Sequence, residues 1–250
     1  MKDREAIILA GGKGSRMKSE LPKVLHKLAN KPIVFWTIET LKNAGIEQIV
    51  IVTGYRSELI KKEVQQQRYK KIGFVRQKTL LGTGNAVEAG LQRVPDRVRY
   101  AVIIFGDDSG LYRPDTIKAL IENHIRSGSP MTILTTYNPA SSYLGGLERN
   151  QFGDVVGVLS GRQIQEKKIK QEIVCGAFCF DREWLAQNIT KIPINPTSGE
   201  YGLPSLIKIA ASQGRFANTF ELPDPNEWTS VNTQEELQYA DQLKVKQIRV

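Results

Sequence analysis

The feature that most constrains the fold is the alternation of short apolar runs with helical patterns in the first half of the 250-residue chain. Residues 6–10 (AIILA) and 49–53 (IVIVT) are continuous apolar segments, and such segments suit strands that are buried on both faces. Between them, apolar residues from 33 to 44 recur at helical spacing. Strands separated by helices in this rhythm predict a parallel sheet with helices on both faces. We therefore expect an α/β, Rossmann-like fold with a mixed, mainly parallel sheet.

The remaining elements are predicted from the same patterns. Ser57 is placed to cap a helix, Pro114 to open another, and Gly145-Gly146 to form a loop. Some strands of the second half are expected to be antiparallel. The predicted strands are 72–75, 100–105, 132–136, 155–159, 173–180 and 216–222, and the predicted helices are 57–67, 84–91, 200–211 and 234–244.

Composition narrows the class of partner. The formal net charge of +9 suits anionic ligands, but the sequence contains no basic helix, RNA-recognition signature or zinc-finger pattern, so no nucleic-acid partner is expected. No apolar stretch approaches a membrane span, so no membrane partner is expected either. Cys175 and Cys179 are interpreted as packed thiols, and a cytoplasmic location is expected.

A glycine-rich loop follows the first predicted strand. Gly11, Gly12 and Gly14 allow backbone N–H groups to approach phosphate oxygens, and Arg16 and Lys23 supply positive charge nearby. A glycine cluster alone also fits a tight turn. The dinucleotide-binding pattern fits poorly, because methionine occupies the place of its third glycine, and the Walker pattern is absent.

Two aspartates follow the predicted strand 100–105. In parallel sheets ligands bind beyond the carboxyl ends of the strands, so we expect Asp107 and Asp108 to lie on the same edge as the glycine loop. Either carboxylate is a candidate ligand for a cation at that edge. A lone Gly-Asp also fits a turn, and Asn232 fits a helix cap before Gln234.

The segment from Leu9 to Leu25, LAGGKGSRMKSELPKVL, closely resembles the signature of the sugar-1-phosphate nucleotidyltransferases. Within that family it is most similar to the uridyltransferase domain of the bifunctional N-acetylglucosamine-1-phosphate uridyltransferases. The resemblance continues, in order, at Gln77 and at residues 81–86, 105–107, 199–201 and 230–232.

The resemblance implies the nucleotide-diphospho-sugar transferase fold. It implies a single nucleotidyltransferase domain over residues 1–250, with a nucleotide-binding half at 1–137 and a sugar-binding half at 138–250. The family pattern assigns catalytic charge to Arg16 and Lys23, and sugar contacts to Gly145 and Asn232. It assigns Mg²⁺ to Asp107 and Asn232, with Asp108 as the rival of Asp107. The nucleotide contacts that it implies are Leu9, Ala10, Gly11, Gly12, Gly14, Lys23, Gln77, Gly82 and Thr83, with the last three reading uracil.

The implied reaction joins UTP to a sugar 1-phosphate and releases pyrophosphate, giving an activated sugar for cell-envelope precursors. N-acetylglucosamine 1-phosphate is the first choice of sugar. Val174, Ser160 and Gly146 depart from the family pattern, so glucose 1-phosphate or another hexose 1-phosphate is an alternative, as is a non-catalytic nucleotide-sugar binder. The hexapeptide repeats of the family's acetyltransferase domain are absent, so acetyl transfer is not expected, and the oligomeric state is left open.

Overall fold

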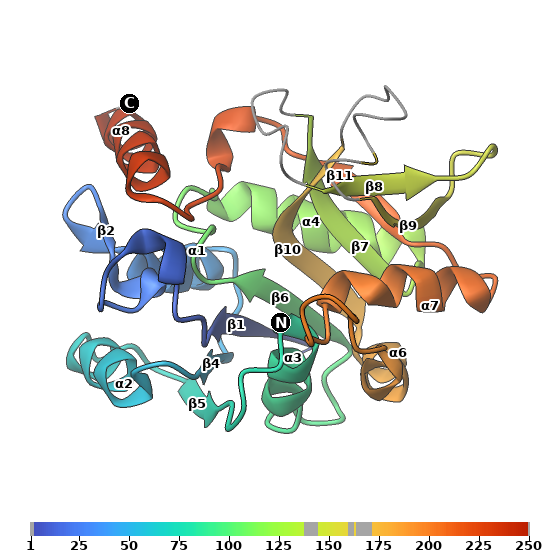
Figure 1. Cartoon of the computed structure of the whole chain (residues 1–250), viewed down its shortest axis with the longest axis horizontal. Helices are drawn as coiled ribbons and strands as arrows, with labels where there is room; N and C mark the ends of the chain where they lie inside the picture. The colour runs from blue at the N-terminus through green and yellow to red at the C-terminus, as the bar shows by residue number, and fades with distance from the viewer. Residues whose placement is uncertain (1–2, 138–144, 160–162, 164–171, 250) are drawn as a thin grey trace.

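The computed structural model describes residues 3–137, 145–159, 163 and 172–249. Its centre is a seven-stranded sheet in the order β11-β7-β10-β6-β1-β4-β5 (Figure 1). A hairpin of β8 and β9 and a short pair of β2 and β3 lie outside it. The strands are β1 (Arg4–Ala10), β2 (Lys27–Leu28), β3 (Lys31–Pro32), β4 (Ile49–Thr53), β5 (Ile72–Arg76), β6 (Tyr100–Phe105), β7 (Met131–Thr136), β8 (Gly146–Arg149), β9 (Val155–Leu159), β10 (Ile173–Asp181) and β11 (Asn218–Glu221).

The sheet is mixed and mainly parallel, as predicted. Strand β1 pairs in parallel with β4 and β6, β4 with β5, and β7 with β11. Strand β10 is antiparallel to both of its neighbours, β6 and β7. One sheet therefore combines strands from both predicted halves of the chain, because β10 comes from the second half and lies between two strands of the first.

Helices cover both faces of the sheet, which confirms the predicted α/β class. One apolar cluster packs α1 (Ile33–Asn43), α2 (Ser57–Gln66) and α4 (Pro114–Ser127) against the sheet. A second cluster packs α3 (Thr83–Leu91), α6 (Arg182–Asn188) and α7 (Leu206–Ser212) on the opposite face. Within the described residues, no helix combines the length and apolar composition needed to cross a bilayer. The 3-10 helices are η1 (Ser15–Met17), η2 (Lys23–Leu25), η3 (Ile189–Lys191), η4 (Leu203–Ser205) and η5 (Pro225–Glu227).

Three local predictions are wrong. Ser57 does not cap α2, because Arg56 occupies the N-cap position with φ 46° and the Ser57 hydroxyl instead bonds the Thr53 hydroxyl at 2.7 Å. The helix predicted for 200–211 begins only at Leu206, because a 3-10 turn containing a proline precedes it. Gly146 is not in a loop but begins β8, which pairs with β9.

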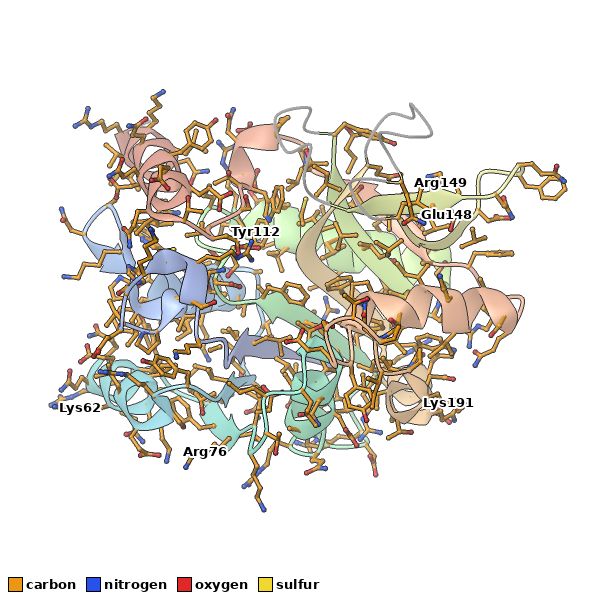
Figure 2. The ribbon with its side chains drawn as sticks, viewed as in Figure 1. Lys62, Arg76, Tyr112, Glu148, Arg149 and Lys191 are labelled. Atoms are coloured by element: carbon orange, nitrogen blue, oxygen red, sulfur yellow. The ribbon has the colours of Figure 1, made fainter. Side chains whose placement is uncertain are left out.

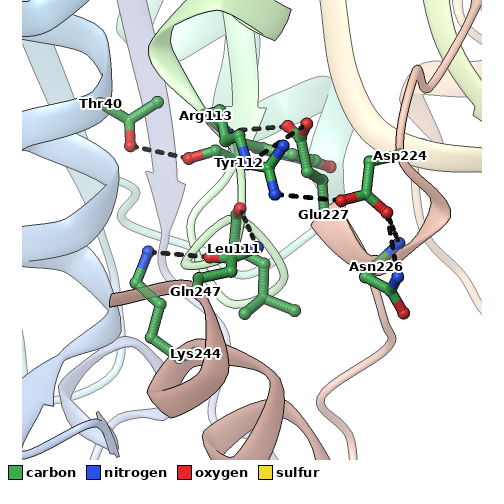
Figure 3. A network of polar contacts seen from close by, with 9 residues as sticks. All are labelled: Thr40, Leu111, Tyr112, Arg113, Asp224, Asn226, Glu227, Lys244 and Gln247. Carbon is green, nitrogen blue, oxygen red and sulfur yellow. Dashed lines mark hydrogen bonds and ion pairs between the residues drawn. The ribbon is translucent and has the colours of Figure 1, made fainter. Parts of the chain in front are cut away.

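The last helix, α8 (Gln234–Arg249), packs on a third apolar cluster and is held by polar contacts at its end (Figure 3). The Gln247 amide donates to the Leu111 carbonyl at 3.1 Å, and Lys244 donates to Gln247 at 3.3 Å. Nearby, the Arg113 backbone N–H donates to the buried carboxylate of Glu227 at 2.9 Å. These contacts fix α8, and with it the segment that immediately precedes the helix.

Most cations are solvated, as their scatter in the sequence suggests. Lys62, Arg76 and Lys191 all lie exposed on the outer surface, whereas Tyr112 is enclosed (Figure 2). Cys175 and Cys179 are buried, free thiols, which confirms their interpretation as packing residues.

His124 provides a test of the core through pH. It is 2% exposed, its Nδ1 lies 3.0 Å from the Thr132 hydroxyl, and burial lowers its pKa to about 4. In the unfolded chain the imidazole has an ordinary pKa of about 6.5, so between pH 6.5 and 4 only the unfolded state takes up this proton. We expect this group to lower the free energy of unfolding by about 2–3 kcal/mol between pH 7 and pH 4.5.

The matched variant is His124→Gln, which cannot take up that proton. Urea unfolding at pH 7 and pH 4.5 should show a smaller loss of stability with acid in the variant than in the wild type. An equal loss in both proteins would contradict the assignment.

Candidate active site

The candidate active site is a pocket of roughly 240 Å³ at the carboxyl edge of the sheet, where β1, β5 and β6 end. The glycine loop and the residue after β6 lie on this one edge, as their positions after parallel strands led us to expect. The residues that line the pocket are Leu9, Ala10, Gly11, Gly12, Lys23, Val24, Gln77, Leu80, Gly82, Thr83, Ala86, Phe105, Asp107 and Glu200.

The first part of the glycine loop lies across the end of β4. The Gly11 carbonyl accepts a hydrogen bond from the Tyr55 N–H at 3.0 Å. A Cβ atom on Gly54 would lie 2.7 Å from the Gly11 carbonyl, so only glycine permits this approach. Gly12 is exposed, and a Cβ there would meet nothing within 4 Å. The loop is therefore fixed on one side and open to a ligand at Gly12.

Gly14 shapes the loop around Lys23. Its φ of 65° lies in the left-handed region, and a Cβ atom would lie only 2.7 Å from Cγ of Lys23. Gly14 is not part of the pocket lining, unlike Gly11 and Gly12. The structure thus gives it the role of positioning the lysine.

A hydrogen-bonded cluster at the pocket edge joins four residues that are far apart in the sequence. The ammonium of Lys23 donates to Oδ2 of Asp107 at 2.5 Å and to Oδ1 of Asn232 at 2.9 Å. The guanidinium of Arg16, which is exposed, also donates to Oδ1 of Asn232 at 2.9 Å. Two cations and two oxygen ligands are thereby brought together beside the glycine loop.

Asp107 and its neighbour Asp108 face different surroundings. Asp107 lines the pocket, whereas Asp108 accepts a hydrogen bond from the Val231 N–H at 3.2 Å and is not part of the lining. Burial raises the pKa of Asp108, and the nearby carboxylate of Asp107 raises it further. Asp108 therefore holds the C-terminal segment in place, and Asp107 is the carboxylate that a ligand in the pocket would meet.

The start of α8 presents Asn232. The Glu236 carboxylate accepts from the Asn232 backbone N–H, and the Glu236 N–H donates to the Thr233 hydroxyl at 3.2 Å. Thr233, and not Asn232, therefore caps this helix. The Asn232 side chain is thus free to accept hydrogen bonds from Lys23 and Arg16. Gln234 also donates to the Met17 carbonyl at 2.9 Å and ties the helix to the loop.

Gln77 also lines the pocket and is 5% exposed. Its amide nitrogen donates to the Gly82 carbonyl at 3.1 Å and to Oδ1 of Asn85 at 2.9 Å. In this assignment of the amide, its oxygen accepts no hydrogen bond from the described residues and lies beside Gly11. The free acceptor suits a ligand N–H group.

The segment after Gln77 is clamped by the C-terminal half of the chain. Gly82 has φ 96°, and a Cβ atom there would lie 2.8 Å from the Tyr201 carbonyl. That carbonyl accepts from the Gly84 N–H at 2.7 Å, and the Leu203 N–H donates to the Thr83 hydroxyl at 2.9 Å. Gly82 and Thr83 thus form a fixed wall of the pocket.

Several lining residues were assigned no role in the sequence. Leu80 is 46% exposed, and Phe105 and Glu200 complete the wall. Phe105 and Glu200 lie within the segments 105–107 and 199–201 that carry the family resemblance, and this was the signal that could have found them. Leu80 lies between Gln77 and the segment 81–86, and the sequence gives no signal for its exposure.

The residues predicted for the sugar side do not all line the pocket. Gly145 is not part of the lining, and a Cβ atom there would lie 2.6 Å from the Leu159 carbonyl, so hairpin packing explains this glycine. Val174 lies near the start of β10, two residues before Gly176, which packs on the pocket residue Phe105. Ser160 lies outside the described residues.

The donor set at the pocket edge fits a magnesium ion. Oδ2 of Asp107 and Oδ1 of Asn232 converge on one cationic centre, the Lys23 ammonium, at 2.5 and 2.9 Å. One carboxylate and one amide oxygen beside an open pocket leave room for waters and substrate phosphates, which Mg²⁺ retains as ligands. Asp107 and Asn232 are therefore the residues that would hold it.

Comparison with known proteins agrees with this geometry. Residues 6–172, which include the glycine loop, Gln77 and Asp107, match the MobA-like NTP transferase domain. The chain belongs to this family. As a MobA-like NTP transferase domain it is a nucleotidyltransferase by type, and its mixed, mainly parallel sheet is consistent with the nucleotide-diphospho-sugar transferase fold.

Individual relatives extend the similarity to the rest of the chain. Proteins named bifunctional protein GlmU from Bacillus cereus (strain G9842), Bacillus thuringiensis (strain Al Hakam) and Bacillus anthracis (strain CDC 684 / NRRL 3495) are each 32% identical over 242 residues. The match covers 96% of this MobA-like chain and 52% of each relative. The chain thus spans about half the length of the curated relatives that it matches.

Proposed function

We propose that the chain joins UTP to a sugar 1-phosphate and releases pyrophosphate, with N-acetylglucosamine 1-phosphate as the first choice of sugar. The observation that carries the proposal is the cluster of Arg16, Lys23, Asp107 and Asn232 beside the glycine loop. Positive charge and oxygen ligands beside a glycine loop suit a bound triphosphate, which supports the proposal. The resemblance of the sequence motifs to the N-acetylglucosamine-1-phosphate uridyltransferases supports the choice of substrates, and the similarity to the GlmU proteins extends over 96% of the chain.

In the proposed reaction an oxygen of the sugar phosphate attacks the α-phosphorus of UTP in line, and the bond to the β-phosphate oxygen breaks. No general base is required, because the attacking phosphate is already ionised. Lys23 and Arg16 stabilise the charge that develops on the phosphate oxygens. The open backbone at Gly12 positions those oxygens. When bound at Asp107 and Asn232, Mg²⁺ would neutralise further phosphate charge.

The preference for uracil rests on Gln77. Its amide nitrogen is engaged by Gly82 and Asn85, so its oxygen is the group left for a base. The imide N–H of uracil is a suitable donor to that oxygen, whereas the corresponding ring nitrogen of cytosine is an acceptor. The same edge occurs in thymine, so TTP is the nearest competitor.

A panel of nucleotides and sugars tests the proposal. Pyrophosphate release should be measured with UTP, TTP, CTP, ATP and GTP, each with N-acetylglucosamine 1-phosphate, glucose 1-phosphate and other hexose 1-phosphates in the presence of Mg²⁺. We expect the greatest kcat/KM with UTP and N-acetylglucosamine 1-phosphate. Binding of UTP without turnover on any sugar would instead indicate a non-catalytic nucleotide-sugar binder.

Val174 provides a test of sugar specificity. The family pattern has asparagine at this position, and valine removes one hydrogen-bonding side chain from the proposed sugar side. We expect Val174→Asn to raise kcat/KM for N-acetylglucosamine 1-phosphate about 5–150-fold, because one buried hydrogen bond contributes roughly 1–3 kcal/mol. Val174→Thr, which adds a hydroxyl at similar volume, is the matched control. An unchanged ratio of sugar preferences would remove Val174 from the sugar site.

A further inference from the structure

A second pocket lies at the amino end of the sheet. It has a volume of roughly 350 Å³ and is bordered by the starts of β1, β4 and β5 and by the loop after α3. Glu5 in this pocket and Ala10 in the candidate active site are both on β1, about 16 Å apart at roughly 3.3 Å per residue. The two pockets share no lining residue among those described. They are therefore separate sites at opposite ends of the sheet.

The lining of this second pocket contains a carboxylate without a protein donor. Glu5 is only 6% exposed, yet within the described part of the chain it has neither a hydrogen-bond donor nor an ion-pair partner for its side chain. Its oxygens are not among the described polar atoms that are both fully enclosed and unpartnered, so they remain accessible from the pocket. Burial of the residue raises the pKa of Glu5, and the charge of Arg97 partly opposes this. The carboxylate is therefore available to a ligand that donates hydrogen bonds.

The rim of the pocket carries unpaired positive charge. Arg93 and Arg97 are exposed, and neither has an ion-pair partner among the described residues. Lys71 also lines the pocket but is paired with Glu47. Two free guanidinium groups against the single charge of Glu5 leave the site net positive, which favours an anionic ligand over a neutral zwitterion.

The loop that carries both arginines is held in place. The Arg182 guanidinium donates to the Val94 carbonyl at 3.2 Å and pairs with Asp96 at 2.5 Å. The side chain of Val94 is buried in the apolar cluster beneath. Arg93 and Arg97 therefore project from a fixed segment. Because the loop is already ordered, ligand binding would cost little conformational entropy there.

We propose that this pocket binds a hydroxyl-bearing phosphate monoester. The ligand hydroxyls donate to the carboxylate of Glu5, and the phosphate oxygens accept from Arg93 and Arg97, whose fork geometry suits phosphate. The volume is that of an ordinary small-molecule site. Inorganic phosphate alone would satisfy the rim and leave Glu5 without a donor, so it should bind more weakly.

Calorimetric titration of the chain with glucose 6-phosphate, inorganic phosphate and sorbitol tests this assignment. We expect glucose 6-phosphate to bind tightest. Glu5→Gln should weaken binding of glucose 6-phosphate about 10–100-fold, the usual effect of losing hydrogen bonds to a charged group, while binding of inorganic phosphate is maintained. The double variant Arg93→Gln with Arg97→Gln should weaken binding of both phosphates.

Asp107→Ala is the control for binding in the candidate active site, and its affinity for glucose 6-phosphate should equal that of the wild type. Thermal unfolding checks that Glu5→Gln is folded. The arginine variant provides an independent test, because both side chains are exposed. Absence of binding, equal affinity in the wild type and all pocket variants, or loss of binding in Asp107→Ala would each overturn the proposal.

Discussion

Replacing Asp107 with alanine is expected to lower kcat about 10³-fold or more and to remove the dependence of turnover on Mg²⁺. Asp107 lines the pocket and contacts the Lys23 ammonium at 2.5 Å, so the change removes a proposed metal ligand and leaves a buried cation without its carboxylate. Pyrophosphate release measured over a range of Mg²⁺ concentrations reports both the fall in kcat and the loss of Mg²⁺ dependence. Asp107→Asn should behave similarly, because the amide lacks the charge.

Asp108→Asn is the matched control. The Asp108 carboxylate accepts from the Val231 N–H, and an asparagine oxygen can accept the same bond, so the metal dependence should stay near that of the wild type. The ligand assignment would move to Asp108 if Asp107→Ala kept its turnover at saturating Mg²⁺ while Asp108→Asn lost it.

Arg16→Ala is expected to lower kcat by about 10²–10³-fold, the usual effect of removing one preorganised donor to developing charge. Arg16 is exposed and is held toward the pocket edge by its hydrogen bond to Asn232, so its loss should have little effect on folding. Steady-state kinetics with the preferred nucleotide and sugar would separate kcat from KM.

Arg126→Ala serves as the control for this change, since Arg126 is an exposed arginine in α4 with no proposed part in the reaction. It should leave both constants unchanged. A rise in KM alone for Arg16→Ala would contradict the proposed stabilisation of the transition state.

The main outline of the fold could be predicted because its strands are continuous apolar runs. Residues 49–53 and 100–105 form strands with the predicted bounds. The position of β10 could not be predicted, because the order of strands in a sheet depends on contacts between distant segments. The start of α7 was missed because the 3-10 turn at Leu203–Ser205 has the same apolar spacing as a helix.

The site was predictable to a different degree at each residue. The glycine loop and Asp107 follow separate strands, and the rule for parallel sheets already placed them on one edge. Asn232 lies well beyond the last predicted strand, so only the family resemblance connected it with them. Leu80 and Glu200 reach the pocket through the packing of residues 200–203 on the segment after β5, which no local pattern reveals.

The antiparallel strand β10 has a consequence for how the chain is made. It fills the position between β6 and β7, so the first 137 residues alone would expose the facing edges of both strands. Unpaired edges of apolar strands readily associate with other chains. During synthesis these edges stay open until residue 181 has emerged from the ribosome. Residues 1–137 are therefore not expected to fold on their own, and we expect the growing chain to be most prone to aggregation just before β10 is complete.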